Sequence, residues 1–167
     1  KINLIACGTS FYSCQVATYW IEKIVGVSST AHLASEFRYK PIVEKSDNVL
    51  SIFISQSGET ADTLAALKYA KNNKSKTLSL VNASESSIAR ESHFVISIAA
   101  GPEIGVASTK AFSAQLSVLA CLCLIMARKK KRISKKKELL LTESLLEIPS
   151  NMLSVLEIHK KINKVTK

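Results

Sequence analysis

Short apolar runs alternate with helix-like patterns along most of the chain. Nearly continuous apolar runs predict strands that are covered on both faces, which is typical of a parallel sheet. The expected strands are 2–6, 29–33, 48–55, 77–81 and 93–98. The first expected helix is capped by Thr9 and Ser10 and ends at Gly26. Three further helices are expected at 60–71, 84–91 and 109–126. This alternation predicts a doubly wound α/β fold.

The pattern changes after Met126. Two further helices are expected at 138–148 and 150–165, separated by Pro149. Residues 126–167 hold 12 of the 23 basic side chains of the chain and 4 of its 13 acidic ones. We therefore expect three parts, which are a domain at 1–127, a basic linker at 128–137 and a helical segment at 138–167.

Composition and charge narrow the class of protein. A length of 167 residues suits one globular domain, and 47% apolar residues exclude a disordered chain. The net charge of +10 lies mostly in the C-terminal part and does not describe the domain. A basic run can attract nucleic acid or an anionic membrane. This run has no interleaved aromatic side chains for base stacking, so we expect a solvated linker and no nucleic-acid partner.

The cysteines and the length of the apolar runs indicate in which cell compartment the protein is expected. Cys7, Cys14, Cys121 and Cys123 lack the spacing of metal ligands and lie in apolar stretches. We expect four buried free thiols, no metal site and a reducing compartment, the cytoplasm. The apolar run 114–127 is shorter than the ~20 residues of a membrane-spanning helix, so no membrane is expected. The chain opens at Lys1 directly on a strand, which suggests a piece of a longer protein.

Two strand-to-helix turns, 7–10 and 55–60, carry the candidate chemistry. Unpaired N–H groups at a helix start favour an anion, and the Ser and Thr hydroxyls in both turns add donors. Gly58 allows a tight turn and a close approach of the backbone to a ligand. The turns match neither the Walker pattern nor G-x-G-x-x-G. Hydroxyls that only cap helices are the alternative, but two such turns on one parallel sheet favour a phosphate site.

The second turn, Ser55-Gln56-Ser57-Gly58-Glu59-Thr60, resembles the signature turn of sugar isomerase (SIS) domains. The segments 6–10, 34–39 and 103–112 are similar to the first SIS half of the glutamine–fructose-6-phosphate aminotransferase (glucosamine-6-phosphate synthase) family. The resemblance runs in order from Ile2 to about Gln115. It implies a flavodoxin-like SIS domain with three α/β/α layers and a five-stranded parallel sheet, followed by C-terminal helices.

The resemblance also implies a binding site. The family holds the phosphate of a sugar phosphate with hydroxyls that correspond here to Ser10, Ser55, Ser57 and Thr60, with Gln56 beside them. It places the sugar near Cys7, Gly8, Thr9, Val106, Ala107 and Ser108. Its members convert fructose 6-phosphate and glutamine to glucosamine 6-phosphate and glutamate without a metal or organic cofactor, and their SIS domains pair. A sugar phosphate such as fructose 6-phosphate or glucosamine 6-phosphate and a second copy of the chain are therefore the expected partners.

The catalytic residues of the family match nothing in this sequence. They belong to a glutaminase domain and to a second SIS half, so we expect binding here with little or no chemistry. Glu59 and Glu103 are the candidate general bases, but a helix-dipole role and a loop-ordering role are favoured for them. His32 and His93 are expected to be structural. Lys110 is expected to order the loop 102–109.

Two other functions stay open. The first is a non-catalytic SIS sensor that binds a sugar phosphate and regulates a partner. The second is a stand-alone sugar-phosphate isomerase, which would need Glu59 or Glu103 together with His93 as an acid–base pair. For Arg38, packing between loops or subunits is favoured over phosphate binding.

Overall fold

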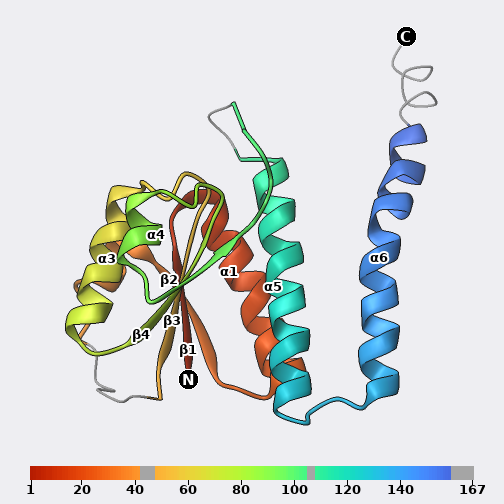
Figure 1. Ribbon diagram of the computed structural model, residues 1–167, viewed down its shortest axis with the longest axis horizontal. Helices are drawn as coiled ribbons and strands as arrows, with labels where there is room; N and C mark the ends of the chain where they lie inside the picture. Colours follow the sequence, from red (N-terminus) through yellow and green to blue (C-terminus); the bar gives the residue numbers. More distant parts are fainter. Residues whose placement is uncertain (42–47, 105–107, 159–167) are drawn as a thin grey trace.

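The structure is a computed structural model that describes residues 1–41, 48–104 and 108–158. Among these residues, the strands are β1 (Ile2–Ala6), β2 (Ser29–Leu33), β3 (Leu50–Ser55), β4 (Lys76–Val81) and β5 (Phe94–Ser97). They form one five-stranded sheet in the order β2-β1-β3-β4-β5, and every neighbouring pair is parallel (Figure 1). The predicted parallel sheet is confirmed.

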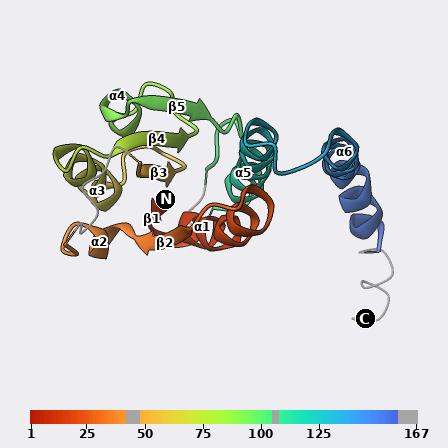
Figure 2. The ribbon, with the colours of Figure 1, turned by 90° about the horizontal axis from the view of Figure 1, so that it is seen from below.

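Helices cover both faces of the sheet (Figure 2). One layer holds α1 (Gly8–Trp20), the short π-helical turn η1 (Ile21–Val25) and α5 (Lys110–Lys129). The other holds α2 (Ala34–Phe37), α3 (Ala61–Asn72) and α4 (Ser87–Glu91). The three-layer α/β/α architecture is therefore confirmed. Gly26 ends η1 in the left-handed conformation, as predicted.

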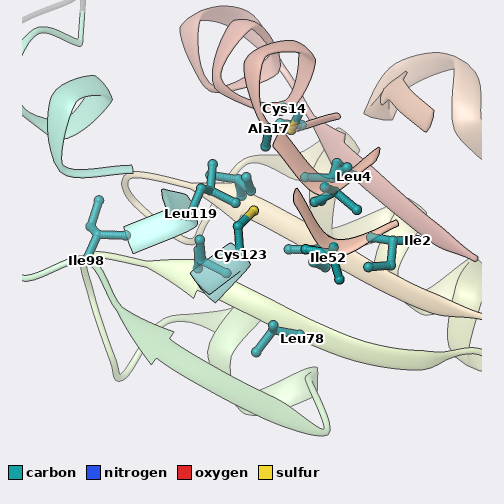
Figure 3. Packing of buried hydrophobic residues seen from close by; sticks show 14 of the residues in the cluster. Ile2, Leu4, Cys14, Ala17, Ile52, Leu78, Ile98, Leu119 and Cys123 are labelled. Atoms are coloured by element: carbon teal, nitrogen blue, oxygen red, sulfur yellow. The ribbon is translucent and has the colours of Figure 1, made fainter. Parts of the chain in front are cut away.

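Strand β1 shows why its sequence is apolar throughout. Leu4 faces α1 and α5, while Ile5 faces α3 and α4, and both are fully buried. Side chains alternate between the faces of a strand, so a strand covered on both sides has no solvent-facing position. On the α5 side, Leu119 and Cys123 pack against Ile52 of β3 and the neighbouring strands (Figure 3). Burial raises the pKa of the Cys123 thiol to about 12.

Two predictions about local structure are wrong. Thr9 and Ser10 do not cap α1, because Cys7 is its N-cap residue and both hydroxyl residues lie in its first turn. The thiols are free, but Cys121 is exposed and Cys7 is half-buried, so only Cys14 and Cys123 are buried as predicted. Cys121 lies on the side of α5 away from the sheet, which a local apolar pattern does not reveal.

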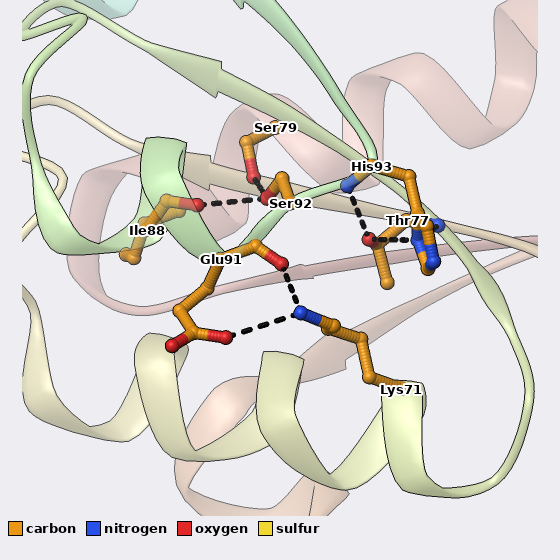
Figure 4. Close-up of polar contacts among 7 residues, drawn as sticks. All are labelled: Lys71, Thr77, Ser79, Ile88, Glu91, Ser92 and His93. Atoms are coloured by element: carbon orange, nitrogen blue, oxygen red, sulfur yellow. Dashed lines mark hydrogen bonds and ion pairs between the residues drawn. The ribbon is translucent and has the colours of Figure 1, made fainter.

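Polar contacts at the edge of the sheet set where β5 begins (Figure 4). The hydroxyl of Thr77 accepts from the backbone N–H of His93, and the ring Nδ1 of His93 lies 2.8 Å from that hydroxyl. Ser92, whose hydroxyl contacts Ser79, donates to the carbonyl of Ile88 at 2.8 Å. Lys71 of α3 pairs with Glu91 at 3.1 Å. The structural role expected for His93 is confirmed by these contacts.

Helix α6 (Lys135–Glu157) runs without a break through Pro149, whereas two separate helices were predicted. Proline removes one backbone hydrogen bond and crowds the preceding turn. Most of the helix is exposed, and only Glu138, Leu141 and Leu145 are half-buried. Helix α5 extends to Lys129, which leaves only five residues between the two helices. None of the 23 residues of α6 is buried.

Two helices in the described part of the chain are long and apolar enough to cross a membrane by length and composition alone. They are α5, with a mean hydropathy of 1.8, and α6, with a mean hydropathy of 1.2. The 20-residue α5 is longer than the apolar run recognised in the sequence. Its apolar face packs on α1 and the sheet, which accounts for its composition.

Candidate functional site

The two hydroxyl-rich turns meet at the carboxyl ends of the neighbouring strands β1 and β3. Ala6 and Ile54 are partners in the β1–β3 pairing, so the turns that follow them emerge side by side. Helix α1 then packs on one face of the sheet and α3 on the other. In doubly wound sheets, ligands bind in the crevice that opens where successive connections leave to opposite faces. This sheet has that crossover between β1 and β3.

A cavity of about 280 Å³ lies between the turns. Its lining consists of Cys7, Gly8, Thr9, Ser10, Ile54, Ser55, Gln56, Ser57, Thr60, Glu103 and Ser108. Nine of the predicted site residues are therefore together in one cavity, and Val106 and Ala107 lie outside the described residues. Ile54 and Glu103 complete the described lining. Glu103 carries the only formal charge among these lining residues, and that charge is negative.

The turn after β3 is held by its own hydroxyls. The Oγ of Ser55 accepts from the N–H of Gly58 at 3.0 Å and lies 3.0 Å from the Oγ1 of Thr60. The Oγ of Ser57 accepts from the N–H of Glu59 at 3.1 Å. A hydroxyl has one hydrogen and two lone pairs, so Ser57 can still donate to an acceptor in the cavity. Thr60 is the N-cap residue of α3, but its side chain makes no capping hydrogen bond.

The helix-capping alternative for these hydroxyls therefore fails at both turns. Neither Cys7 before α1 nor Thr60 before α3 caps its helix with a side chain. Both helices, 13 and 12 residues long, direct their N-terminal ends toward the cavity lined by these turns. Neutral hydrogen-bond donors and helix N-terminal ends are groups that favour an anion.

The carboxylate of Glu103 binds the start of α5. It accepts from the backbone N–H of Thr109 at 2.9 Å and of Lys110 at 3.0 Å, and from the hydroxyl of Ser108 at 3.1 Å. These bonds, the Thr109 N–H first, hold the pKa of Glu103 below its ordinary value. The carboxylate is therefore an internal cap that joins the loop after β5 to α5. Lys110 takes part in this ordering through its backbone N–H.

We expect Glu103→Gln to destabilise the protein at neutral pH and to have no effect in acid. A carboxyl whose pKa is lowered in the folded state stabilises the fold above its ordinary pKa, and this contribution is lost as the pH falls through the lowered value. Thermal unfolding from pH 7 to pH 3 is the measurement. The melting temperatures of the wild type and the variant should converge below the ordinary pKa of 4.5. A difference that stays constant with pH would contradict this role, and Glu143→Gln on the exposed α6 is the control.

The other charged candidates lie away from the cavity. Glu59 accepts from the N–H of Ser87 at 2.7 Å, which lowers the pKa of Glu59 and places it at the start of α4. The carboxylate of Glu59 therefore interacts with the N-terminal end of α4. The prediction had placed this helix-dipole interaction at α3, which directly follows Glu59 in the sequence. Arg38 pairs with Asp62 of α3 at 3.5 Å, which is the packing role expected for it. The ring of His32 lies tilted against that of Phe37, with the ring centres 5.2 Å apart, and burial lowers the pKa of His32.

Two residues near the site were missed in the sequence. Asn82, directly after β4, donates to the carbonyl of Gly101 at 2.7 Å and accepts from the N–H of Ala100 at 2.9 Å. It therefore ties the loop after β5 to the end of the sheet. Gln115 of α5 is fully buried and donates to the Ser10 hydroxyl at 2.9 Å. In the sequence, Asn82 could have been noticed as a polar residue directly after a strand, and Gln115 as a single amide on an otherwise apolar helix face.

A three-layer domain with a parallel sheet and a hydroxyl-lined cavity at its crossover has the architecture of doubly wound α/β domains, in which ligands bind at that crossover. The chain belongs to the SIS domain family, whose sequence profile matches residues 1–125. Among the described residues, no group of three or more His, Cys, Asp or Glu side chains could hold a metal ion.

Two curated proteins are similar in sequence to nearly the whole of this chain. The chain is 46% identical over 168 residues to the glutamine–fructose-6-phosphate aminotransferase (isomerizing) of Bartonella quintana, and the match covers 99% of this chain and 28% of that protein. It is 48% identical to the enzyme of the same name from Bradyrhizobium diazoefficiens, over 27% of that protein. The chain thus spans little more than a quarter of the length of these curated relatives.

Solved structures show the same fold. The C-terminal domain of the glucosamine-fructose-6-phosphate aminotransferase from Francisella tularensis superposes with a TM-score of 0.92 and 39% identity, over 98% of this chain and 46% of that one. The glucosamine-6-phosphate deaminase of Thermotoga maritima superposes with a TM-score of 0.70, over 86% of this chain and 44% of that one. Its 22% identity shows a shared fold and no more.

Proposed function

We propose that this chain binds the phosphate and part of the sugar of fructose 6-phosphate or glucosamine 6-phosphate. The observation that carries the proposal is the cavity between the two turns, where hydroxyls and two helix N-termini converge. A sugar phosphate is dianionic at one end and hydroxyl-rich at the other, and both ends suit neutral hydrogen-bond donors. Without a lysine or arginine in the described lining, the site suits a ligand that is bound and released in metabolism.

The proposed wider activity is that of a glutamine–fructose-6-phosphate aminotransferase. In this reaction the amide nitrogen of glutamine is transferred to fructose 6-phosphate, and ketose-to-aldose isomerisation gives glucosamine 6-phosphate and glutamate. We assign binding, not proton transfer, to this chain. This assignment is supported by the contacts of the three candidate acid–base groups. The carboxylate of Glu103 is hydrogen-bonded to the start of α5, the carboxylate of Glu59 to the start of α4, and the ring of His93 contacts the hydroxyl of Thr77. A stand-alone isomerase would need one of these carboxylates free beside its substrate.

Ligand-dependent thermal unfolding tests the proposed site. A ligand that binds only the folded state raises the melting temperature by mass action. We expect fructose 6-phosphate and glucose 6-phosphate to raise it, and unphosphorylated fructose to leave it unchanged. Ser57→Ala/Thr60→Ala should weaken binding by about 100-fold, since each removed hydroxyl donates to a charged oxygen. Inorganic phosphate reports whether the phosphate alone is sufficient.

Ser117→Ala is the matched control for that experiment. It removes a hydroxyl that donates to the carbonyl of Ser113 on the exposed side of α5. Its melting temperature should rise with the sugar phosphates as in the wild type. The proposal fails if millimolar sugar phosphate does not stabilise the wild type, or if the double variant still responds as the wild type does.

The chain is further proposed to act as a homodimer in the cytoplasm. Free cysteines support a reducing compartment. The support for a dimer is α6, on which Leu139, Leu146 and Leu153 are 58%, 75% and 64% exposed and follow one another at seven-residue spacing. Such residues form one stripe along a helix. We retain the division into a sugar-phosphate-binding domain at 1–127, a basic segment at 128–137 and a helical segment at 138–167 as part of this proposal, with α5 and α6 extending into the basic segment from either side.

The ends of that stripe have opposite charge. Lys135 and Glu157 lie on the same side of α6 as the three leucines, one at each end of the helix. In an antiparallel pair of α6 helices centred on Leu146, Lys135 of each copy would face Glu157 of the other. The same pairing places Leu139 opposite Leu153, so one stripe is self-complementary about a two-fold axis.

A further inference from the structure

A buried amide lies directly behind the proposed phosphate site. Gln115 is fully buried on α5, on the same helix face as Ala111 and Leu119, which are also fully buried. An apolar residue would fill such a position without the cost of removing an amide from water. Here the amide is hydrogen-bonded, and its partners are two serines of α1, Ser10 and Ser13.

The contacts of the amide are directional. Its Nε2 donates to the Oγ of Ser10 at 2.9 Å, and its Oε1 accepts from the Oγ of Ser13 at 3.1 Å. The Oγ of Ser13 also donates to the carbonyl oxygen of Ser10 at 2.7 Å, so the two acceptors share its single hydrogen. The three residues therefore form one buried network between α5 and the first turn of α1.

The network decides which way the Ser10 hydroxyl can donate. Its oxygen has one hydrogen and two lone pairs, and one lone pair accepts from the amide of Gln115. The hydrogen cannot point at the same N–H group, and because Ser10 lines the cavity it can be directed there. A phosphate oxygen is purely an acceptor, and a hydroxyl whose hydrogen is already directed toward it needs no reorientation on binding.

We propose that Gln115 is a positioning residue of the phosphate site, acting through Ser10. The inference rests on the proposed function, because it requires that an anion occupies the cavity that Ser10 lines. Gln115 itself does not line that cavity. It would act as the support that keeps a neutral donor aimed at the ligand, in a site where the described lining offers no positive charge.

A double-mutant cycle tests this. The variants are Gln115→Met, Ser10→Ala and their combination, and the measurement is the dissociation constant for fructose 6-phosphate by calorimetry, with inorganic phosphate as a second probe. We expect Ser10→Ala to weaken binding about 10-fold and Gln115→Met about 3- to 10-fold. If Gln115 acts through Ser10, adding Gln115→Met to Ser10→Ala should cause no further loss.

Two more variants sharpen the test. In Gln115→Glu the carboxylate can only accept, so it would draw the Ser10 hydrogen away from the cavity and weaken binding more than Gln115→Met does. Should Gln115→Glu fail to fold, Gln115→Met carries the test, because methionine is similar in size and apolar. Leu119→Met is the matched control, since it introduces the same residue one turn further along the same buried face. Its affinity should equal that of the wild type.

The outcomes separate the inference from the function on which it rests. Wild-type affinity in Gln115→Met, or losses that multiply in the double variant, would overturn the role of Gln115. The proposed function would still stand if Ser57→Ala/Thr60→Ala weakened binding by about 100-fold in the same assay. Absence of sugar-phosphate binding by the wild type would overturn both.

Discussion

Gly58→Ala is expected to destabilise the protein by about 2–4 kcal/mol and to abolish sugar-phosphate binding by the site. Gly58 has φ of +69°, a left-handed conformation that costs a residue with a Cβ about 1 kcal/mol or more. A Cβ built at this position would overlap the Oγ and the Cβ of Ser86. Ser86 is buried and caps α4, so it cannot move aside freely.

Gly101→Ala separates the two contributions to this effect. Gly101 has nearly the same φ, +68°, but a Cβ there would meet nothing within 4 Å among the described atoms. We expect Gly101→Ala to lower the free energy of unfolding by about 1 kcal/mol, which is the conformational contribution without the clash. Gly58→Ala/Ser86→Gly should recover part of the loss in Gly58→Ala, because the clashing side chain is gone. The measurement is the free energy of unfolding in urea, and equal losses for both glycines would refute the close contact with α4.

The second large effect is expected at α6, where Leu146→Glu/Leu153→Glu should convert the proposed dimer to a monomer. Each leucine covered in an interface contributes about 1.5–3 kcal/mol, and a buried unpaired carboxylate adds a further cost. The dimer dissociation constant should therefore rise by at least about 100-fold. Sedimentation equilibrium measures it. Asn151→Glu adds the same charge to the same helix on another side and should leave the dimer intact.

Charge exchange tests the antiparallel arrangement itself. Lys135→Glu should weaken the dimer because it places two carboxylates together at each end of the helix pair. Lys135→Glu/Glu157→Lys should restore it, since the opposite charges then face each other again. A wild-type chain that is monomeric at high concentration would refute the dimer, and a dimer that ignores both charge variants would refute this pairing.

The sheet could be predicted well because its signal is local. The predicted strand 2–6 matches β1 residue for residue, since a buried strand must be apolar at successive positions. The weaker run 29–33 also matches β2, although β2 is an edge strand with no buried residue. The hydroxyls of both turns could also be found, because residues that follow parallel strands lie at one edge of the sheet. Their assembly into one cavity follows from the β1–β3 pairing, which the sequence expresses only through its resemblance to SIS domains.

The partners of individual polar groups were much less predictable. Gln115 and Ser10 are 105 positions apart in the chain, and their contact depends on how α5 packs against α1. Glu59 is close to α3 in sequence but binds the start of α4. Pro149 predicted a helix boundary, yet α6 continues through it.

The sequence by itself therefore determined the order of the five strands and of the helices α1, α3, α4 and α5 between and after them, the layered fold class and the residue types that line the cavity, since these depend on periodicity and on residue type. Only the tertiary structure decided which hydroxyls remain free to donate, which carboxylates are already engaged and which helix face is uncovered. Those properties are set by contacts between distant segments, and a hydrogen bond or a buried face exists only once the chain has brought both partners together.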